Sequence, residues 1–187
     1  MISQRPLPSV LKGSRITLEK HSMSLAPEMF AMIDVNREHL QDMPWTKLTN
    51  SIEDSKNWIN ATFSEWDNLA LFDYGMYVNG KYIGSCGVHS INWEFKHCEL
   101  GYWIGKEFEG KGYISEAVKL LEDACFTAGF HRVEIRCASF NEASARVALK
   151  NSYKLEGELR EDSLINGKYR STQVYGKLRR EWEAARN

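Results

Sequence analysis

Residues 107–114 read Glu-Phe-Glu-Gly-Lys-Gly-Tyr-Ile, and this short stretch decides how the rest of the sequence is interpreted. It lies between a segment that alternates as a strand, 98–104, and one with apolar residues three and four apart, 115–128, as in an amphipathic helix. Two glycines allow the backbone to turn so that successive N–H groups point at one spot, and the following helix adds its positive dipole end. The stretch predicts an anion-binding turn whose spacing is neither that of a P-loop nor that of GxGxxG.

The strand before this turn carries a glycine, Gly101, in its middle, which predicts a bulge or the close approach of another backbone. A strand that separates from its neighbour leaves N–H and C=O groups free, and an extended amide ligand can pair with them. An anion-binding turn a few residues beyond such an edge suits a ligand with an amide arm and a pyrophosphate. This combination indicates coenzyme A.

Outside this stretch, the apolar patterns predict an α/β (α+β) architecture, a mixed sheet with helices on its faces. Asn79-Gly80 and Asn166-Gly167 each join two predicted strands, and Asn-Gly suits a tight hairpin turn. The predicted strands are 15–19, 72–78, 81–88, 98–104, 132–138, 153–162 and 169–178. The predicted helices are 24–40, 52–66, 115–128 and 141–151, followed by a charged helical tail at 179–186.

The length and charge of the chain limit its class. The 187 residues suit one domain, and we expect a single unit over 1–187. The 24 Lys and Arg against 25 Asp and Glu give a formal net charge of −1, which provides no general attraction to nucleic acid or to an anionic membrane. No apolar run reaches the roughly 20 residues of a bilayer span, and the first residues lack a signal-peptide pattern. We expect a cytoplasmic protein that binds neither nucleic acid directly nor a membrane.

Neither the cysteines nor the histidines have the spacing of a metal site, so no metal is expected. The four cysteines are scattered through apolar segments without a CxxC pair, which favours reduced, buried thiols. These cysteines are Cys86, Cys98, Cys125 and Cys137. His39, His89 and His97 are expected to have ordinary structural or surface roles.

Residues 101–117, which read GYWIGKEFEGKGYISEA, closely resemble the GNAT superfamily of N-acetyltransferases. Within it they are similar to the RimJ/RimL-like group, whose named members acetylate N-termini of ribosomal proteins. Residues 141–144 and 155–161 extend the resemblance. It implies the GNAT fold, with a central sheet of about seven strands splayed in the middle and helices on both faces. It also implies an enzyme that uses acetyl-CoA as the acetyl donor, and it allows a homodimer.

The resemblance further implies which residues hold acetyl-CoA. Its pyrophosphate would lie on the backbone amides of Gly110, Lys111, Gly112, Tyr113 and Ile114. Its pantetheine arm would pair with Tyr102, Trp103 and Ile104, and Asn141 of an Asn-x-x-Ser pattern joins these cofactor residues. Two positions depart from the family: Glu109 replaces Gln or Arg, and Ser152 replaces Gly. Because a carboxylate repels phosphates, we expect Glu109 to point outward.

Direct attack of an amine on a thioester needs a neutral amine and a proton for the departing thiolate. Glu99, on the strand before the turn, is the candidate base, directly or through water; alternatively it only pairs with a residue of a neighbouring strand. Ser144 is the candidate group near the thiolate, with Tyr153 as the alternative. Asn141 and Ser144 also have the spacing of a helix cap, and both roles can hold together.

The acceptor side is less defined in the sequence. Residues 36–67 hold six acidic and three basic residues together with three tryptophans, which suits a cationic amine, although most of these side chains are expected in the core or on the surface. Trp45, just after Pro44, is the candidate to face the substrate. The sequence leaves three hypotheses: an acetyltransferase for a protein N-terminus, one for a small amine such as a polyamine, an aminoglycoside or an aminoacyl nucleotide, and a non-catalytic acyl-CoA-binding module.

Overall fold

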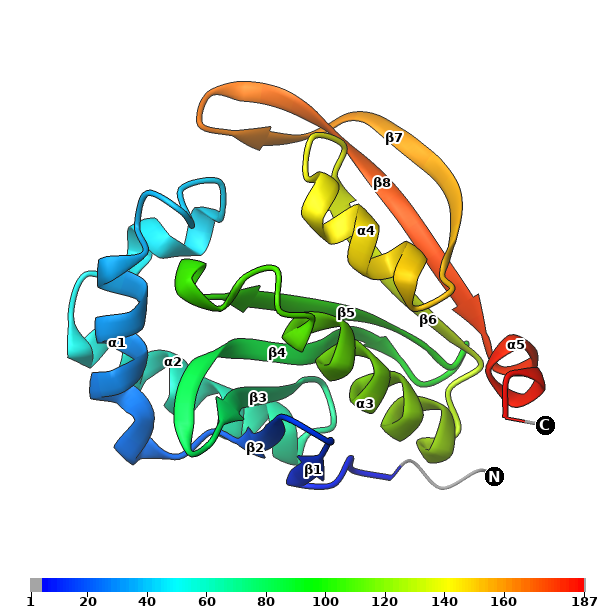
Figure 1. Ribbon diagram of the computed structural model, residues 1–187, viewed down its shortest axis with the longest axis horizontal. Helices are drawn as coiled ribbons and strands as arrows, with labels where there is room; N and C mark the ends of the chain where they lie inside the picture. Colours follow the sequence, from blue (N-terminus) through cyan, green and yellow to red (C-terminus); the bar gives the residue numbers. More distant parts are fainter. Residues whose placement is uncertain (1–4, 187) are drawn as a thin grey trace.

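The computed structural model describes residues 5–186, and a mixed sheet of eight strands runs through it in the order β1-β2-β3-β4-β5-β6-β8-β7 (Figure 1). The strands are β1 Val10–Lys12, β2 Thr17–Lys20, β3 Phe72–Val78, β4 Lys81–Asn92, β5 His97–Ile104, β6 Arg132–Ala138, β7 Lys154–Ile165 and β8 Lys168–Leu178. The helices are α1 Ala26–Val35, α2 Ile52–Asp67, α3 Tyr113–Ala128, α4 Glu142–Lys150 and α5 Arg179–Ala184. Short 3-10 turns lie at η1 Met23–Leu25, η2 Pro44–Leu48 and η3 Lys106–Phe108.

The predicted fold class is confirmed, with an added edge strand and an earlier end of the first long helix. The seven predicted strands are present, and the three-residue β1 is an eighth strand at the sheet edge. The first long helix ends at Val35 instead of near Leu40. Its end is set by Asn36, whose side-chain amide donates to the carbonyl of Met32 at 2.8 Å and so competes with the helix backbone.

Both Asn-Gly turns have the backbone that the sequence predicts. Asn79 and Gly80 have φ values of 51° and 77°, and Asn166 and Gly167 have 51° and 72°. Positive φ at both central residues defines the type I′ turn, whose twist matches that of the two strands it joins. The β3–β4 and β7–β8 hairpins follow from these two dipeptides.

Helices cover both faces of the sheet. The larger core lies under α3 and α4 and includes Ala117, Val118, Leu121 and Ala148. The smaller core lies on the opposite face, where α1 and α2 bring Met29, Ile33 and Ile59 against Tyr82. The β7–β8 hairpin rises beyond α4 and arches toward the segment between α1 and α2 (Figure 1). All four cysteines are buried free thiols, as predicted.

The sheet opens in its middle, between β5 and β6. These parallel strands pair from His97 with Arg132 to Leu100 with Ile135, and the pairing ends there. Beyond Leu100, β5 continues to Ile104 while it pairs with β4. The edge of 101–104 that faces β6 is therefore free, which is the predicted splay.

The prediction of a bulge or a backbone approach at Gly101 is wrong. Gly101 pairs with Gly87 in regular antiparallel register. A side chain fills the space above it instead: a Cβ built on Gly101 would lie 2.8 Å from Nε2 of His89. Among residues 5–186, no helix has the length and apolar character that crossing a bilayer requires.

Candidate functional site

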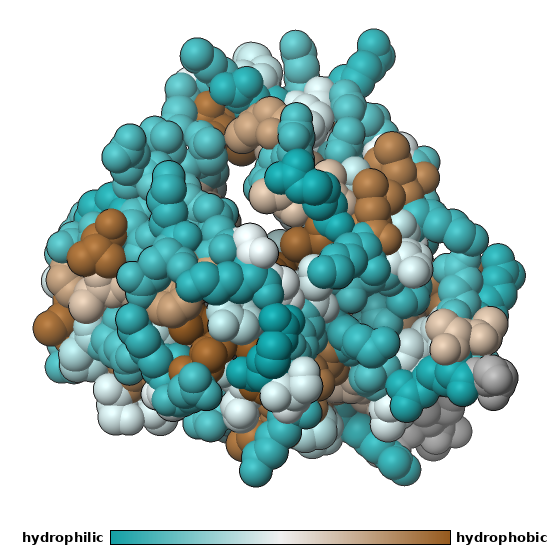
Figure 2. Space-filling model, viewed as in Figure 1, coloured by the Kyte–Doolittle hydropathy of each residue, from teal (hydrophilic) through white to brown (hydrophobic). Residues whose placement is uncertain are grey.

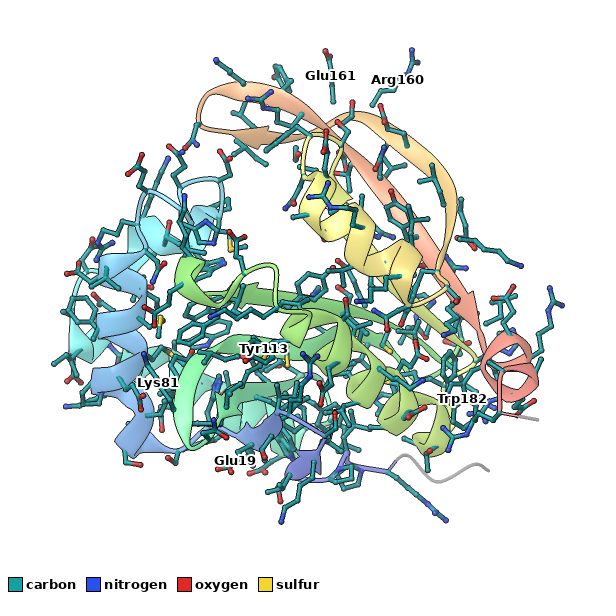
Figure 3. The ribbon with its side chains drawn as sticks, viewed as in Figure 1. Glu19, Lys81, Tyr113, Arg160, Glu161 and Trp182 are labelled. Carbon is teal, nitrogen blue, oxygen red and sulfur yellow. The ribbon has the colours of Figure 1, made fainter. Side chains whose placement is uncertain are left out.

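The glycine turn lies between η3 and α3, beside the free edge of β5. Gly110 has a φ of 71° and Gly112 has a φ of 80°, a left-handed conformation that favours glycine. Gly112 is the N-cap of α3, so the first free N–H groups of this helix begin at the turn. Tyr113 stands in the first turn of α3, near the centre of the molecule (Figure 3). The turn predicted from residues 107–114 is present, and its amides include those of Gly110 to Ile114.

Arg15 contacts this turn from one side, and the sequence did not predict this contact. Its Nη1 donates to the carbonyl of Lys111 at 2.8 Å, and its Nη2 lies 3.4 Å from the carbonyl oxygen of Gly112. Its Nε pairs with Oε2 of Glu116 at 2.8 Å. A trans peptide places its N–H opposite its C=O. The N–H groups of Gly112 and Tyr113 consequently point away from Arg15, toward the side on which an anion can bind.

Glu109 is turned away from the amides, as expected. Its side chain is 43% exposed, and its Oε1 lies 3.5 Å from Nε2 of His39. Nearby, the exposed Lys111 has its Nζ 5.5 Å from the centre of the Phe108 ring. The mouth of the turn therefore carries the exposed carboxylate of Glu109, and the ammonium groups of Lys111 and Lys150 lie near it.

Strand β5 presents different chemistry on its two faces because successive side chains alternate. Leu100 belongs to the core under α3, and Tyr102 packs against it. Trp103 packs on the opposite face with α1 and η2. The side chain of Glu99 lies on this second face with that of His89. The two faces beside the free edge therefore differ: hydroxyl groups lie on the α3–α4 face, and carboxylates lie on the α1–α2 face.

On the α3–α4 face, Tyr102 and Ser144 meet. Their hydroxyl oxygens lie 2.8 Å apart, and Ser144 is nearly buried. Burial raises the pKa of Tyr102 above its ordinary value, so the phenol keeps its proton. Asn141 accepts a hydrogen bond from the Ser144 N–H at 3.0 Å, which is the predicted helix cap. Tyr153, the alternative to Ser144, lies elsewhere in the core, with Nζ of Lys177 5.5 Å from its ring centre.

On the α1–α2 face, Glu99 stands among charged neighbours. Its Oε1 lies 4.0 Å from Nε2 of His89, and its Oε2 lies 3.7 Å from Nε of Arg136 on β6. Burial raises the pKa of the Glu99 carboxyl, the Arg136 guanidinium opposes this rise, and Glu134 adds to it. Glu99 thus makes the cross-strand pairing that the sequence offered as the alternative to a role as base. Its raised pKa also suits a base.

Trp45 lies on this face, beside Trp103. It lies on η2, and its ring centre is 5.5 Å from that of Trp103, the neighbour of the free edge. The tip of the β7–β8 hairpin contacts the same segment: Lys47 Nζ donates to Asn166 Oδ1 at 2.7 Å, and Asn166 Nδ2 donates to the carbonyl of Gln41 at 3.2 Å. Figure 2 shows the hollow that these parts surround. Arg160 and Glu161, at the bend of β7, project away from it (Figure 3).

Comparisons with known proteins agree with this geometry. A family model described as "Acetyltransferase (GNAT) domain" matches residues 15–154. YdaF of Bacillus subtilis (strain 168), a candidate ribosomal N-acetyltransferase, is 34% identical over 120 residues, which span 64% of this chain and 66% of that protein. The ribosomal-protein-serine acetyltransferase of Escherichia coli (strain K12) is 25% identical over 166 residues, 87% of this chain and 93% of that protein.

A solved structure has the same fold. The microcin C7 self-immunity acetyltransferase MccE, crystallised with acetyl-CoA and AMP, superposes with a TM-score of 0.87 at 28% identity. The superposition covers 91% of this chain and 97% of that chain. Among residues 5–186, no group of three His, Cys, Asp or Glu side chains is arranged to hold a metal ion.

Proposed function

The chain belongs to the GNAT family of acetyltransferases, as residues 101–117 implied, and from this membership we propose that it transfers an acetyl group from acetyl-CoA to the N-terminal α-amine of a protein by direct attack. The observation that carries the proposal is the opening between β5 and β6. It gives the free edge a hydroxyl pair on one face and a carboxylate on the other. We further propose that residues 1–187 act as one catalytic unit.

The residues present fit acetyl-CoA. The backbone amides of 110–114 would hold the pyrophosphate, with Arg15 keeping two of them correctly oriented. A Cβ built on Gly110 meets nothing within 4 Å, so the turn is open on that side. The free edge of Tyr102, Trp103 and Ile104 would pair with the amides of pantetheine. When bound there, acetyl-CoA supplies the thioester carbon that the amine attacks.

Glu99 is the group we assign to the proton of the acceptor amine. An α-amine has a pKa near 8 and a lysine amine one near 10.4, so an N-terminus needs less help from a base. The raised pKa of Glu99 makes it a stronger base than an exposed carboxylate. Arg136, 3.7 Å away, opposes this rise of the Glu99 pKa.

Ser144 and Tyr102 are the groups we assign to the departing sulfur. The Ser144 hydroxyl can donate to the thiolate while it accepts from Tyr102, whose phenol is 2.8 Å away. Because the pKa of Tyr102 is raised, this pair stabilises the thiolate by hydrogen bonding and does not become ionised itself. Asn141 would contribute by fixing the first turn of α4 under Ser144.

A protein N-terminus as acceptor is supported by the E. coli relative, whose name specifies a ribosomal protein, over 87% of this chain. The hollow between η2, α4 and the hairpin tip would admit the end of a chain beside Trp45 and Trp103 (Figure 2). A second candidate acceptor is a small-molecule amine, which the likeness to MccE at 28% identity favours, because that enzyme was crystallised with AMP.

The experiment that tests the proposal measures CoA thiol release from acetyl-CoA with purified protein. The acceptors are N-terminal peptides of ribosomal proteins, the same peptides with a blocked α-amine, polyamines, aminoglycosides and aminoacyl nucleotides. Release with free peptides alone is the expected result. Release with a small amine alone would show that the acceptor is a small molecule and would leave the proposed acetyl transfer unchanged. Acetyl-CoA binding without release from any acceptor supports a binding module and contradicts the enzyme.

A further inference from the structure

The His89 side chain lies over the first residue of the free edge of β5. A Cβ built on Gly101 would lie 2.8 Å from its Nε2 and 3.2 Å from its Cδ2. Gly101 pairs regularly in an extended strand, so the backbone itself does not require a glycine there. The absence of a side chain at 101 is accounted for by the ring that occupies the space.

The backbone beyond His89 directs this ring. The register of β4 against β5 shifts between His89 and Asn92, and Ser90 has a φ of 50° although it is not a glycine. Irregularities of this kind bend a strand and re-aim a side chain, and they occur often beside active sites. The Ser90 Oγ lies 3.2 Å from Nδ1 of His89, which leaves Nε2 directed toward Glu99. The bend of the strand and the Ser90 hydroxyl both favour this orientation of the ring.

Charged groups from three strands face His89. Asp73 lies on β3, Glu99 on β5 and Arg136 on β6, where Arg136 also pairs with Glu134. Burial lowers the pKa of His89, Asp73 opposes this effect, and Arg136 adds to it. Burial raises the pKa of Glu99. The pKa values of the two groups thus shift toward each other, which reduces the difference between them.

We propose that His89 receives, at Nε2, the proton that Glu99 takes from the acceptor amine, and that it releases this proton to solvent. The inference rests on the proposed function. The acceptor ammonium gives its proton to the Glu99 carboxylate, the neutral carboxyl gives it to the His89 imidazole, and the imidazolium gives it to water. The 4.0 Å between Nε2 and Oε1 suits one bridging water or a small rotation. The His89 side chain is 38% exposed, so it has access to solvent.

The structure also indicates why Glu99 needs this help. Its side chain is only 19% exposed, half the fraction of His89. A carboxyl that has accepted a proton in this position must lose it before the next turnover. His89 provides the more exposed of the two groups and stands beside the point where β5 becomes free. His89 is a positioning residue in this scheme, since it acts through Glu99 and does not touch the acceptor.

The first test compares the pH dependence of kcat/KM for wild type, His89→Gln and the control His131→Gln, whose residue is exposed at the start of β6. We expect about a tenfold loss for His89→Gln at pH 7. The loss should shrink above pH ~8, where an α-amine is already neutral. His131→Gln should follow wild type. An equal loss for His89→Gln at every pH indicates a purely structural role and overturns the proposal.

The second test needs no acceptor amine. Its result therefore bears on the relay alone and does not depend on the proposed function. The pKa of His89 is measured by NMR in wild type and in Glu99→Gln. Removing a negative charge 4.0 Å away should lower this pKa. An unchanged value would show that the two groups do not communicate and would overturn the relay even if the enzyme acetylates amines.

A third variant displaces the His89 ring while residue 89 itself is unchanged. Gly101→Ala forces the His89 ring aside, because the new Cβ would lie 2.8 Å from Nε2, and the ring is the movable end of its side chain. Its matched control is Gly157→Ala on β7, where a Cβ meets nothing within 4 Å. We expect Gly101→Ala to show the same pH-dependent loss of kcat/KM as His89→Gln. The control should behave as wild type. Wild-type kinetics for Gly101→Ala would contradict the inference.

Discussion

Replacing Arg15 by alanine should weaken the binding of CoA without unfolding the protein. Arg15 joins the segment between β1 and β2 to the glycine turn, about a hundred residues later in the chain. It donates to the carbonyls of Lys111 and Gly112 and thereby turns the opposite N–H groups toward the anion side. Without the guanidinium, the carbonyl of Lys111 loses its partner, whereas the carbonyl of Gly112 keeps the helical bond from the Glu116 N–H at 3.1 Å. The Gly112 amide must then be oriented by the ligand itself.

The magnitude follows from the contacts that are lost. The bond to Lys111 has a good length, 2.8 Å, whereas that to Gly112 is long at 3.4 Å and contributes little. A charge-assisted hydrogen bond contributes about 1.5–3 kcal/mol when it is protected from water. The Arg15 side chain is 50% exposed, which reduces the contribution to about 1 kcal/mol. Since 1.4 kcal/mol corresponds to tenfold, we expect the Kd for CoA to rise about fivefold.

Isothermal titration calorimetry with CoA measures this change directly, and the melting temperature is recorded for each variant. The control is Arg146→Ala on α4, which removes an arginine that is 69% exposed and pairs with Glu142. It should leave both the Kd and the melting temperature unchanged. If Arg15→Ala binds CoA within twofold of wild type, then Arg15 does not set the direction of the amides, and the argument from peptide geometry is refuted.

Four other substitutions test the remaining parts of the site. Ser144→Ala and Tyr102→Phe should each lower kcat about tenfold in the thiol-release assay with little effect on the Kd for CoA, because each removes part of the hydroxyl pair that we assign to the departing sulfur; equal losses in binding would contradict this role. Asn166→Ala frees the hairpin tip from the α1–α2 segment, so the KM for the acceptor should rise while the melting temperature stays within about a degree; hydrogen exchange at both segments reports the release. Glu99→Gln should raise the melting temperature at pH 8. Burial raises the folded-state pKa of Glu99, so its contribution to stability is complete below the ordinary pKa of about 4.3 and is lost as the pH rises through the folded pKa. The advantage of the variant should therefore vanish near pH 4, and a gain that persists there would disagree with the sign of the shift.

Local sequence was sufficient wherever one residue type determines the backbone. The Asn-Gly turns at 79–80 and 166–167 adopt positive φ because few other dipeptides do so easily. The glycines of the turn before α3 could be identified for the same reason. The end of α1 could not be predicted, because Asn36 stops the helix with a side-chain bond that competes with a favourable apolar pattern.

The rest of the site depends on pairings between distant segments, which no local pattern encodes. The contact of Arg15 with Lys111 spans 96 residues of sequence. The sequence assigned His89 an ordinary role, because its place above Gly101 depends on the register of β4 against β5. A slip of one residue would turn the ring to the opposite face of the sheet. Tyr102 was predicted as a backbone partner of pantetheine, and its hydroxyl contact with Ser144 on α4 was missed for the same reason.

The position at which β5 separates from β6 explains why the backbone of Glu99 and the free edge differ in rigidity. Glu99 stands one residue before the last paired residue, Leu100, so hydrogen bonds to both neighbouring strands fix its backbone. From Gly101 onward only β4 holds the strand, and the other edge is free for a ligand. Because side chains alternate along β5, the Glu99 carboxyl and the Tyr102 hydroxyl face opposite sides of the sheet. In the reaction that we propose, acetyl donor and amine acceptor then meet at the opening, and a pairing of β5 with β6 that extended to Ile104 would close it.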